Sequence, residues 1–451
     1  MRELARWAAA WDLHRLPTAI ARRASLILAD DLGAMLAGAA EPQVAQAREG
    51  FIRTTGAAAE ATVFAPGASR LDRYAAAAAN GMAATWCELD EGYRPAPCHA
   101  GAYLLSALLA EAEATQASVA EILGAIAVAY EITARFARAF PFPGMKVHPH
   151  AAFACIGAAA GVSVIRRYDA ATLLGAVTGA ASMTFAGPFR HAMDGALVRN
   201  AWTSAGAWIG LRAADWAQAG ITGIADTPYD VFVGAFGTRA LPDQLTVGLG
   251  EHWAVSDGYH KIYACCQYAH STVEASLELH ARLAGKRGVE ELTEIVVETH
   301  PLGLALSTVE PPTVLAAKFS IPHAAASVAC IGTGGQPAFA DATLHQPAVA
   351  ELRRRVRMQP YGEVGEWPRD RPARVTWRFR DGAEWSATCE SARGGADQPF
   401  DEATLREKIA TILAPVFPAM PATLAAIGAG DPTLLAHSWR SVVAEMTGGG
   451  G

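Results

Sequence analysis

The sequence predicts a mainly α protein with a large all-helical part and a smaller α+β part. From Leu16 to about Gly220, apolar residues recur at spacings of three and four, and alanine and glycine fill many positions between them. Small residues let helices approach closely, so this region predicts a compact core in which several helices are buried on all sides.

Strand patterns occur only after about Thr246. Residues 292–299 show the β-branched alternation of a strand. Residues 373–380 and 383–388 alternate around Asp381-Gly382, which is typical of a hairpin turn. Between the strand and the hairpin, residues 316–332 predict a helix.

Helical patterns return at 401–412 and 422–445, and the chain ends in four glycines that we expect to be disordered. At 451 residues the chain is too long for one ordinary core and suggests two domains. We therefore predict a helical domain over residues 1–265, completed by 401–451, and an α+β domain over residues 266–400.

The overall composition excludes several classes of protein. Hydrophobic residues make up 51% of the chain, charged residues 18%, and the formal net charge is −7, so we expect no nucleic-acid partner. The low charged fraction means that much apolar surface must be hidden, which suggests an obligate oligomer. No window is long and apolar enough to predict a membrane span, and residues 1–7 predict an amphipathic helix rather than a signal peptide.

The seven cysteines indicate neither a zinc knuckle nor an iron–sulfur cluster, because none forms a C-x-x-C pair. Reduced thiols in a cytoplasmic protein are the simpler interpretation.

Histidines and a lysine stand at three predicted helix entrances. His99 precedes a helix over 102–112, His148 and His150 precede a helix over 151–166, and Lys261 lies nine residues before His270 at the start of another helix. Helix N-termini favour anions. The three entrances together predict a pocket for a substrate with several carboxylates.

Acidic residues precede the first of these histidines. Glu88-Leu89-Asp90-Glu91 is expected to end a helix that runs from about Leu71. A carboxylate close to an imidazole fixes its tautomer and raises its basicity, so Asp90 could orient His99. The alternative is a solvated helix end followed by a histidine that only caps the next helix.

Pro149 holds His148 in an extended conformation outside the following helix. A neutral imidazole there is a suitable proton acceptor. The His148-Pro149-His150 spacing could also indicate a metal pair, but no third ligand stands nearby, so we predict no metal. Structural loop histidines remain the alternative for both.

Three further residues could bind or protonate an anion. Lys261, among aromatic residues and cysteines, needs an anionic partner from the protein or the substrate. Arg199 could grip a carboxylate bidentately or form an ordinary salt bridge. His323, in the Ala-Lys-Phe-Ser-Ile-Pro-His stretch of the second domain, could reach across a domain interface, where pockets commonly lie.

Three common sequence patterns of enzymes are missing. No Gly-x-Gly-x-x-Gly or phosphate loop follows a strand, and the glycine-rich residues 332–335 follow a helix. A G-x-S-x-G nucleophile elbow is also absent. Nicotinamide and nucleotide chemistry are therefore disfavoured.

These features together resemble the MmgE/PrpD family, which includes 2-methylcitrate dehydratase, cis-aconitate decarboxylase and iminodisuccinate epimerase. The segments that carry the likeness are residues 29–38, residues 80–91 with His99, His148, Lys261 with Tyr263, Cys266 and His270, and residues 317–322. Arg199 stands where many members have lysine. His323 stands where the decarboxylase has a tyrosine, which disfavours that reaction here.

The resemblance implies a helical domain completed by the C-terminal helices, a smaller α+β lid domain, a homodimer, and no metal or organic cofactor. It implies a site between the domains that binds di- or tricarboxylates through histidines and lysines. The predicted catalytic residues are His99, His148, Lys261, Asp90 and His323, and the predicted substrate-binding residues are Arg199, His150, His270 and Tyr263.

The leading hypothesis is a cofactor-independent lyase that removes water from a hydroxylated polycarboxylate. His148 or His99 would take the proton next to a carboxylate, and His323 or a second histidine would protonate the departing hydroxide. An epimerase of a dicarboxylate and a decarboxylase of a cis-aconitate-like substrate are the alternatives. A catalytically weak paralogue that only binds carboxylates or a partner represents a different class.

Overall fold

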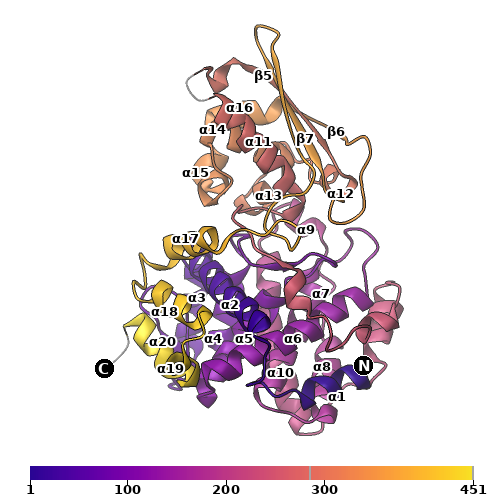
Figure 1. The fold of residues 1–451 in the computed structure, drawn as a ribbon, viewed down its shortest axis with the longest axis vertical. Coiled ribbons are helices and arrows are strands. Elements are labelled where there is room, and N and C mark those ends of the chain that lie inside the picture. The colour runs from indigo at the N-terminus through magenta and orange to yellow at the C-terminus, as the bar shows by residue number, and fades with distance from the viewer. Residues whose placement is uncertain (284–285, 449–451) are drawn as a thin grey trace.

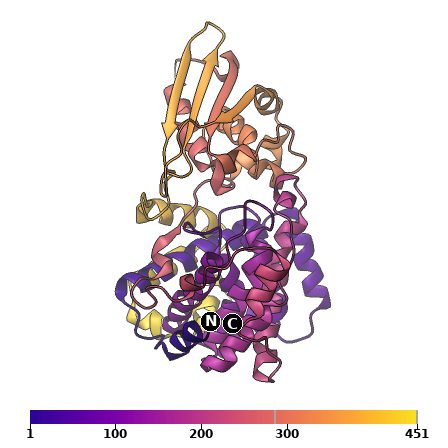
Figure 2. The same ribbon diagram turned by 90° about the vertical axis from the view of Figure 1, so that its right-hand side faces the viewer.

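The computed structural model describes residues 1–283 and 286–448. It has a larger helical body and a smaller α+β body (Figures 1 and 2), so the predicted fold class is confirmed. Beyond Gly448, the glycine tail that we expected to be disordered lies outside the described residues. Within the described ranges, no helix is both long and apolar enough to cross a membrane.

The helical body is built from ten helices of the N-terminal half together with short strand pairs. The helices are α1 (Arg2–Ala10), α2 (Thr18–Ala39), α3 (Pro42–Thr54), α4 (Arg73–Ala84), α5 (Ala100–Thr115), α6 (Val119–Ala139), α7 (Pro149–Ile165), α8 (Ala170–Ala181), α9 (Arg190–Met193) and α10 (Val198–Gln218). The strand pairs are β1 (Ala61–Thr62) with β2 (Arg70–Leu71), and β3 (Gly92–Tyr93) with β4 (Gly258–Tyr259).

Helix α7 is the centre of this body, since all of its residues are buried. It contacts α5, α6, α8 and α10. Gly206 and Gly210 allow α10 to approach α7 closely. A Cβ added at Gly206 would lie 2.6 Å from the Cβ of Ala154, and one added at Gly210 would lie 2.3 Å from the Cβ of Ala158. The small residues of the sequence therefore serve the close helix packing that they predicted.

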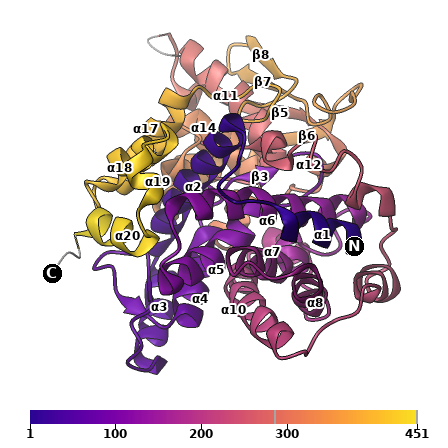
Figure 3. The ribbon, with the colours of Figure 1, turned by 60° about the horizontal axis from the view of Figure 1, so that its bottom comes forward.

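The C-terminal helices return to the helical body (Figure 3), where the first two contact α2 and the last two contact α6 and α5. They are α17 (Glu402–Leu413), α18 (Met420–Gly428), α19 (Pro432–Ala436) and α20 (Trp439–Thr447). The single helix predicted over 422–445 is wrong. Asp431 and Ser438 each accept hydrogen bonds from backbone N–H groups and start new helices at these points.

The α+β body contains a four-stranded sheet in the order β6-β5-β7-β8. The predicted strand and hairpin are confirmed as β5 (Leu292–Thr299), β7 (Ala373–Phe379) and β8 (Glu384–Cys389), while β6 (Val356–Pro360) was not predicted and pairs parallel with β5. On β7, alternate residues Ala373, Val375, Trp377 and Phe379 are buried. They face the helices that cover this sheet face (Figure 2).

The helices of this body are α11 (His270–Leu283), α12 (Pro301–Leu304), α13 (Val314–Lys318), α14 (Ile321–Ile331), α15 (Asp341–Leu344) and α16 (Pro347–Arg354). The single helix predicted over 316–332 is wrong. It is divided between α13 and α14, because the Ser320 hydroxyl accepts a hydrogen bond from the backbone N–H of His323 at 3.0 Å and Pro322 lies in the first turn of α14.

The segment between α4 and α5 differs from the prediction in a way that matters for the site. Helix α4 ends at Ala84, so Glu88 does not lie at the end of a helix but in a loop, with a left-handed φ of +54°. Strand β3 follows this loop and pairs antiparallel with β4. The pairing brings the loop beside Lys261, which is distant in sequence.

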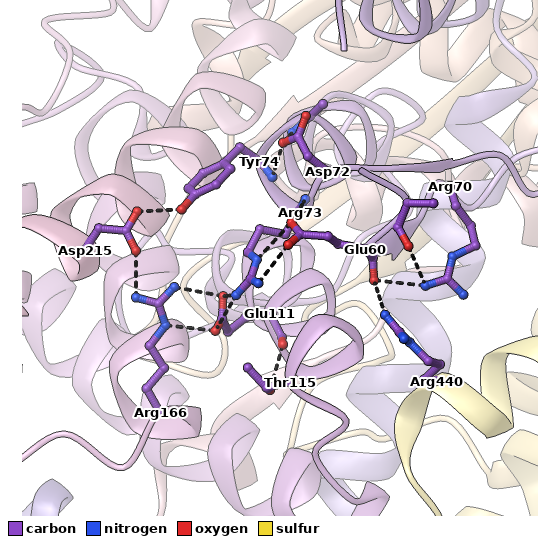
Figure 4. Close-up of polar contacts among 12 residues, drawn as sticks. Glu60, Arg70, Asp72, Arg73, Tyr74, Glu111, Thr115, Arg166, Asp215 and Arg440 are labelled. Carbon is purple, nitrogen blue, oxygen red and sulfur yellow. Dashed lines mark hydrogen bonds and ion pairs between the residues drawn. The ribbon is translucent and has the colours of Figure 1, made fainter. Parts of the chain in front are cut away.

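A buried polar cluster away from that loop connects helices of the helical body (Figure 4). Glu111 on α5 is almost fully buried and accepts hydrogen bonds from both Arg73 and Arg166, at 2.9 to 3.0 Å. Arg166 also pairs with Asp215 on α10 at 2.8 Å. One carboxylate thus ties α4 and the C-terminal end of α7 to α5.

Candidate active site

A small pocket lies where the loop after α4 and the starts of α7 and α10 meet the segments 259–268, Phe319 and Arg371. Its volume of about 50 Å³ is several times the roughly 10–15 Å³ that one water needs, so it can take a small polar ligand. The lining residues are Glu88, Tyr93, Pro97, Cys98, His99, His148, Pro149, Phe189, Arg199, Tyr259, Lys261, Cys266, Gln267, Tyr268, Phe319 and Arg371.

His99 is the pocket residue best arranged to accept a proton. It is the residue before α5, and its Nδ1 lies 2.7 Å from Asp90 Oδ2 and 2.9 Å from the carbonyl oxygen of Glu91. Both neighbours are acceptors, so Nδ1 bears the proton and Nε2 is the free base. The hydrogen bond to the Glu91 carbonyl and the contact with Asp90 together favour the tautomer with the proton on Nδ1.

Asp90 is fully buried and stays ionised. Burial raises the pKa of this carboxyl, but Lys261 and His99 outweigh it and hold the pKa well below its usual range. The charge that orients His99 is therefore present throughout the neutral pH range.

Lys261 is fully buried beside two carboxylates. Its Nζ lies 3.3 Å from Glu88 Oε2 and 3.7 Å from Asp90 Oδ1. Burial lowers the pKa of the ammonium, but Asp90 and Glu88 raise it by more, so the net pKa is above its usual value. Lys261 is a fixed positive charge and not a base at neutral pH.

Glu88 joins the two cations of the pocket, since it forms ion pairs with both Arg199 and Lys261. Burial raises the pKa of its carboxyl, but Arg199 and Lys261 lower it by more than burial raises it, to a net value of about 2. The left-handed backbone at Glu88 costs free energy in a residue with a Cβ, and such conformations cluster at functional sites. The sequence identified this acid only as part of a motif.

Arg199 is held in the first turn of α10 by several contacts. Its Nη1 donates to the carbonyl oxygen of Thr85 at 3.1 Å and to the side chain of Asn200 at 2.8 Å. Its guanidinium also lies over the ring of Phe319, 5.2 Å from the centroid. These contacts fix the guanidinium at the pocket wall.

His148 lies between two donors. Its Nδ1 accepts from the backbone N–H of His150 at 3.2 Å, and its Nε2 lies 3.3 Å from Nε of Arg199. Burial and then Arg199 lower the pKa of His148 well below its usual value, so the ring is neutral. A neutral imidazole has one N–H and one acceptor, so it cannot satisfy both donors. Movement of Arg199 toward a ligand would relieve this conflict.

His150 lies behind the pocket wall. Its Nδ1 lies 2.8 Å from the hydroxyl of Tyr103, and its ring packs against those of His99 and His148, with centroids 5.1 and 4.4 Å away. It does not line the pocket. Its position supports the two histidines that do.

His270 and Tyr263, which the sequence predicted to bind substrate, do not line the pocket either. The Nε2 of His270 lies 3.2 Å from the carbonyl oxygen of Cys265, and the Tyr263 hydroxyl donates to Glu274 at 3.0 Å. Both side chains face the α+β body.

His323 is buried inside the α+β body, away from the pocket. Its Nε2 lies 3.1 Å from the carbonyl oxygen of Ala338, and its Nδ1 lies 3.0 Å from Nη1 of Arg353. Both ring nitrogens therefore have protein partners. Burial lowers the pKa of His323 to about 4.

Arg371, like Tyr259, is a pocket residue that sequence reasoning missed. It comes from the α+β body, just before β7, and stacks on the ring of Tyr268, 4.7 Å from the centroid. Its Nε is buried without a hydrogen-bond partner, and neighbouring Asp370 pairs with Arg94 of the helical body at 2.8 Å. An arginine in a charged loop gives no sequence signal of this position.

Three cations, Arg199, Lys261 and Arg371, thus line a pocket in which Glu88 is the lining carboxylate. Each cation also has a protein carboxylate nearby, since Asp90 lies 3.7 Å from Lys261, Asp370 lies 3.4 Å from Arg371, and Glu88 pairs with Arg199. The donors of these cations suit a ligand with more than one carboxylate, which would compete with the protein carboxylates for them. Within residues 1–283 and 286–448, no group of three or more histidine, cysteine or acidic side chains is arranged to hold a metal ion.

Comparison with known families gives two matches. The MmgE/PrpD N-terminal domain matches residues 2–238, and the MmgE/PrpD C-terminal domain matches residues 263–427. A comparison with curated proteins gave no significant match. Because the two family matches span most of the sequence, the chain belongs to the MmgE/PrpD family.

Proposed function

We propose that this protein is a lyase that removes water from a small hydroxylated di- or tricarboxylate. The family includes dehydratases, decarboxylases and epimerases, so the reaction must be argued from the pocket. The observation that carries the proposal is His99, whose Nδ1 lies 2.7 Å from Asp90 and whose side chain lines the pocket together with Lys261 and Arg199. No cofactor is needed for this chemistry.

In the proposed reaction, Nε2 of His99 takes the proton from the carbon next to a substrate carboxylate. Lys261 and Arg199 bind that carboxylate and stabilise the negative charge that develops on it. His148 is a poorer base, because both of its ring nitrogens face donors.

The departing hydroxide needs a proton from a group that lines the pocket. His323 was expected to supply it, but its ring nitrogens are engaged inside the α+β body, so we leave it out of the mechanism. Tyr259 fits the role. Burial raises the pKa of its phenol and keeps it protonated at neutral pH.

Epimerisation needs two acid–base groups on opposite faces of one carbon. Lys261 and Tyr259 are both poor second bases because their pKa values are raised, so dehydration is favoured over epimerisation. Decarboxylation remains the other alternative. We also propose that the protein works in the cytoplasm, where its seven unpaired cysteines would stay reduced.

The test is turnover of a panel of hydroxylated di- and tricarboxylates, followed by mass spectrometry. Loss of water supports the proposal. Deuterium uptake from solvent without loss of mass indicates epimerisation, and release of carbon dioxide indicates decarboxylation. Binding of carboxylates without any turnover would indicate a binding protein and contradict the proposal.

A further inference from the structure

A second, apolar compartment adjoins the polar pocket. Its volume is about 60 Å³, and none of its lining residues is charged. Four residues line both spaces: Pro97, Pro149, Phe189 and Tyr268. The compartment therefore adjoins the carboxylate pocket at these four residues, on the side of α6 and the loop before α7.

The walls of this compartment are aromatic and fixed. Phe142 and Phe153 line it with ring centroids 6.1 Å apart, and both pack on the buried ring of Phe232, at 6.1 and 5.5 Å. Phe140, another wall residue, stacks on Phe232 at 5.1 Å. Rings held by each other in this way cannot collapse to fill the space.

Water would gain few hydrogen bonds in this compartment, whereas an apolar group would be removed from solvent there. We infer that the substrate carries, beside its carboxylates, an apolar alkyl or aryl substituent longer than one methyl group, and that this compartment binds it. The inference rests on the proposed function, because the polar pocket must hold the carboxylates. It narrows the substrate to a carboxylic acid with an apolar branch.

The test uses unreactive ligands, so that it does not depend on turnover. Succinate, methylsuccinate, ethylsuccinate, propylsuccinate and benzylsuccinate are titrated into the protein by calorimetry. Each added methylene is expected to tighten binding about fourfold until the compartment is full. Equal affinity for all five, or weaker binding with longer chains, would overturn the inference while leaving carboxylate binding intact. If none of the five binds, the proposed function fails, and this inference fails with it.

A variant locates the effect. Met145 lines the apolar compartment but not the polar pocket and is half-buried, so Met145→Trp should fill the space without disturbing the core. The ratio of propylsuccinate affinity to succinate affinity should then fall to about one. Met358→Trp, at a half-buried methionine on β6, is the matched control and should keep the wild-type ratio.

Val147→Phe fills the same compartment from its other side and serves if Met145→Trp fails to fold. A wild-type ratio in a folded filling variant, shown by an unchanged thermal transition, would place the substituent elsewhere and contradict the assignment.

Discussion

Asp90 and His99 form a buried carboxylate–imidazole pair, with Oδ2 2.7 Å from Nδ1, in which the carboxylate is completely buried and the ring reaches the pocket. The pair depends on the loop that follows α4, because Glu88 turns the chain with a left-handed φ. The same turn brings two carboxylates to Lys261. One loop thus positions both His99 and the carboxylates beside Lys261.

Replacement of Asp90 by Asn should lower kcat by about 10²- to 10⁴-fold, because an amide neither holds the Nδ1–H tautomer nor stabilises the imidazolium that forms. His99→Gln should have an effect of similar size. Steady-state kinetics on the active substrate would measure both. Binding of an unreactive dicarboxylate, which uses Arg199 and Lys261, should persist in His99→Gln. Turnover of His99→Gln at the wild-type rate would contradict the role of the imidazole as base.

Glu88→Gln should strengthen anion binding and weaken the fold. In the native protein Glu88 pairs with Arg199 and Lys261, so its loss frees Arg199 for a substrate carboxylate and leaves Lys261 with Asp90 alone. We expect roughly tenfold tighter binding of succinate at low salt. The free energy of unfolding should fall by about 3 kcal/mol, because buried Arg199 loses its carboxylate partner and Lys261 loses one of two. Calorimetry and urea unfolding measure the two effects, and weaker succinate binding would contradict the prediction.

A second carboxylate pair, Asp31 and Glu91, should make the stability fall in alkali. Both face Gly101, where an added Cβ would lie 2.3 Å from Asp31 Oδ2 and 2.8 Å from Glu91 Oε1. Burial raises the pKa of Glu91 to about 8, and burial followed by Glu91 raises that of Asp31 well above its usual range. The folded state thus binds a proton that the unfolded chain releases at lower pH. The contribution of this pair to stability is greatest below the ordinary carboxyl pKa and is lost as the pH rises toward 8.

The measurement for this pair is urea unfolding at about pH 6 and about pH 9. Asp31 Oδ2 has no hydrogen-bond partner in the native protein. In Asp31→Asn an amide N–H replaces this oxygen and can donate to ionised Glu91, so the pair no longer needs to bind a proton. This variant should lose less stability between the two pH values than the wild type. Glu310→Gln, at an exposed ion pair with Arg354, is the matched control. An equal alkaline loss in Asp31→Asn and wild type would exclude this pair as its source.

Local patterns predicted the fold better than the site. β5 and the hairpin matched because alternation and an Asp-Gly turn are written into consecutive residues. The division between α13 and α14 could have been predicted, since Ser320 and Pro322 form a helix-start signal. β6 could not, because its parallel pairing with β5 depends on distant chain segments.

The site residues divide in the same way. His99 and His148 precede helices and line the pocket, as expected from the preference of helix N-termini for anions. His270 and His323 also begin helices, but their rings point into the α+β body. Position at a helix start follows from sequence, whereas the direction of the side chain depends on how the domains pack. Arg371 shows the opposite case, because it lines the pocket although it does not stand at a helix start.

The ion cluster around Glu111 should be a major source of stability that is independent of the active site (Figure 4). Glu111→Gln leaves Arg73 and Arg166 with a weaker, neutral partner in a largely buried position. We expect a loss of about 3 kcal/mol in the free energy of unfolding, with KM unchanged. Glu310→Gln, whose ion pair is exposed, should change it by less than about 0.5 kcal/mol. Similar small losses in both variants would show that the cluster adds little.

We propose that the expected homodimer forms through the apolar end of α10. Trp208 and Trp216 lie about one helical turn before and after Arg212 on the same face of α10, and Ile221 and Ile224 follow in the next loop. These four apolar side chains are 36 to 66% exposed. Such a group of large exposed apolar residues is unusual on a monomer and suits a self-complementary contact.

Size-exclusion chromatography with light scattering should give twice the chain mass for the wild type. Ile221→Glu should shift it toward the monomer, because a charge would be buried in the interface. Val247→Glu, at an exposed valine outside this surface, is the control and should remain dimeric. A wild-type monomer would contradict the dimer itself, and a dimeric Ile221→Glu would place the interface on another face.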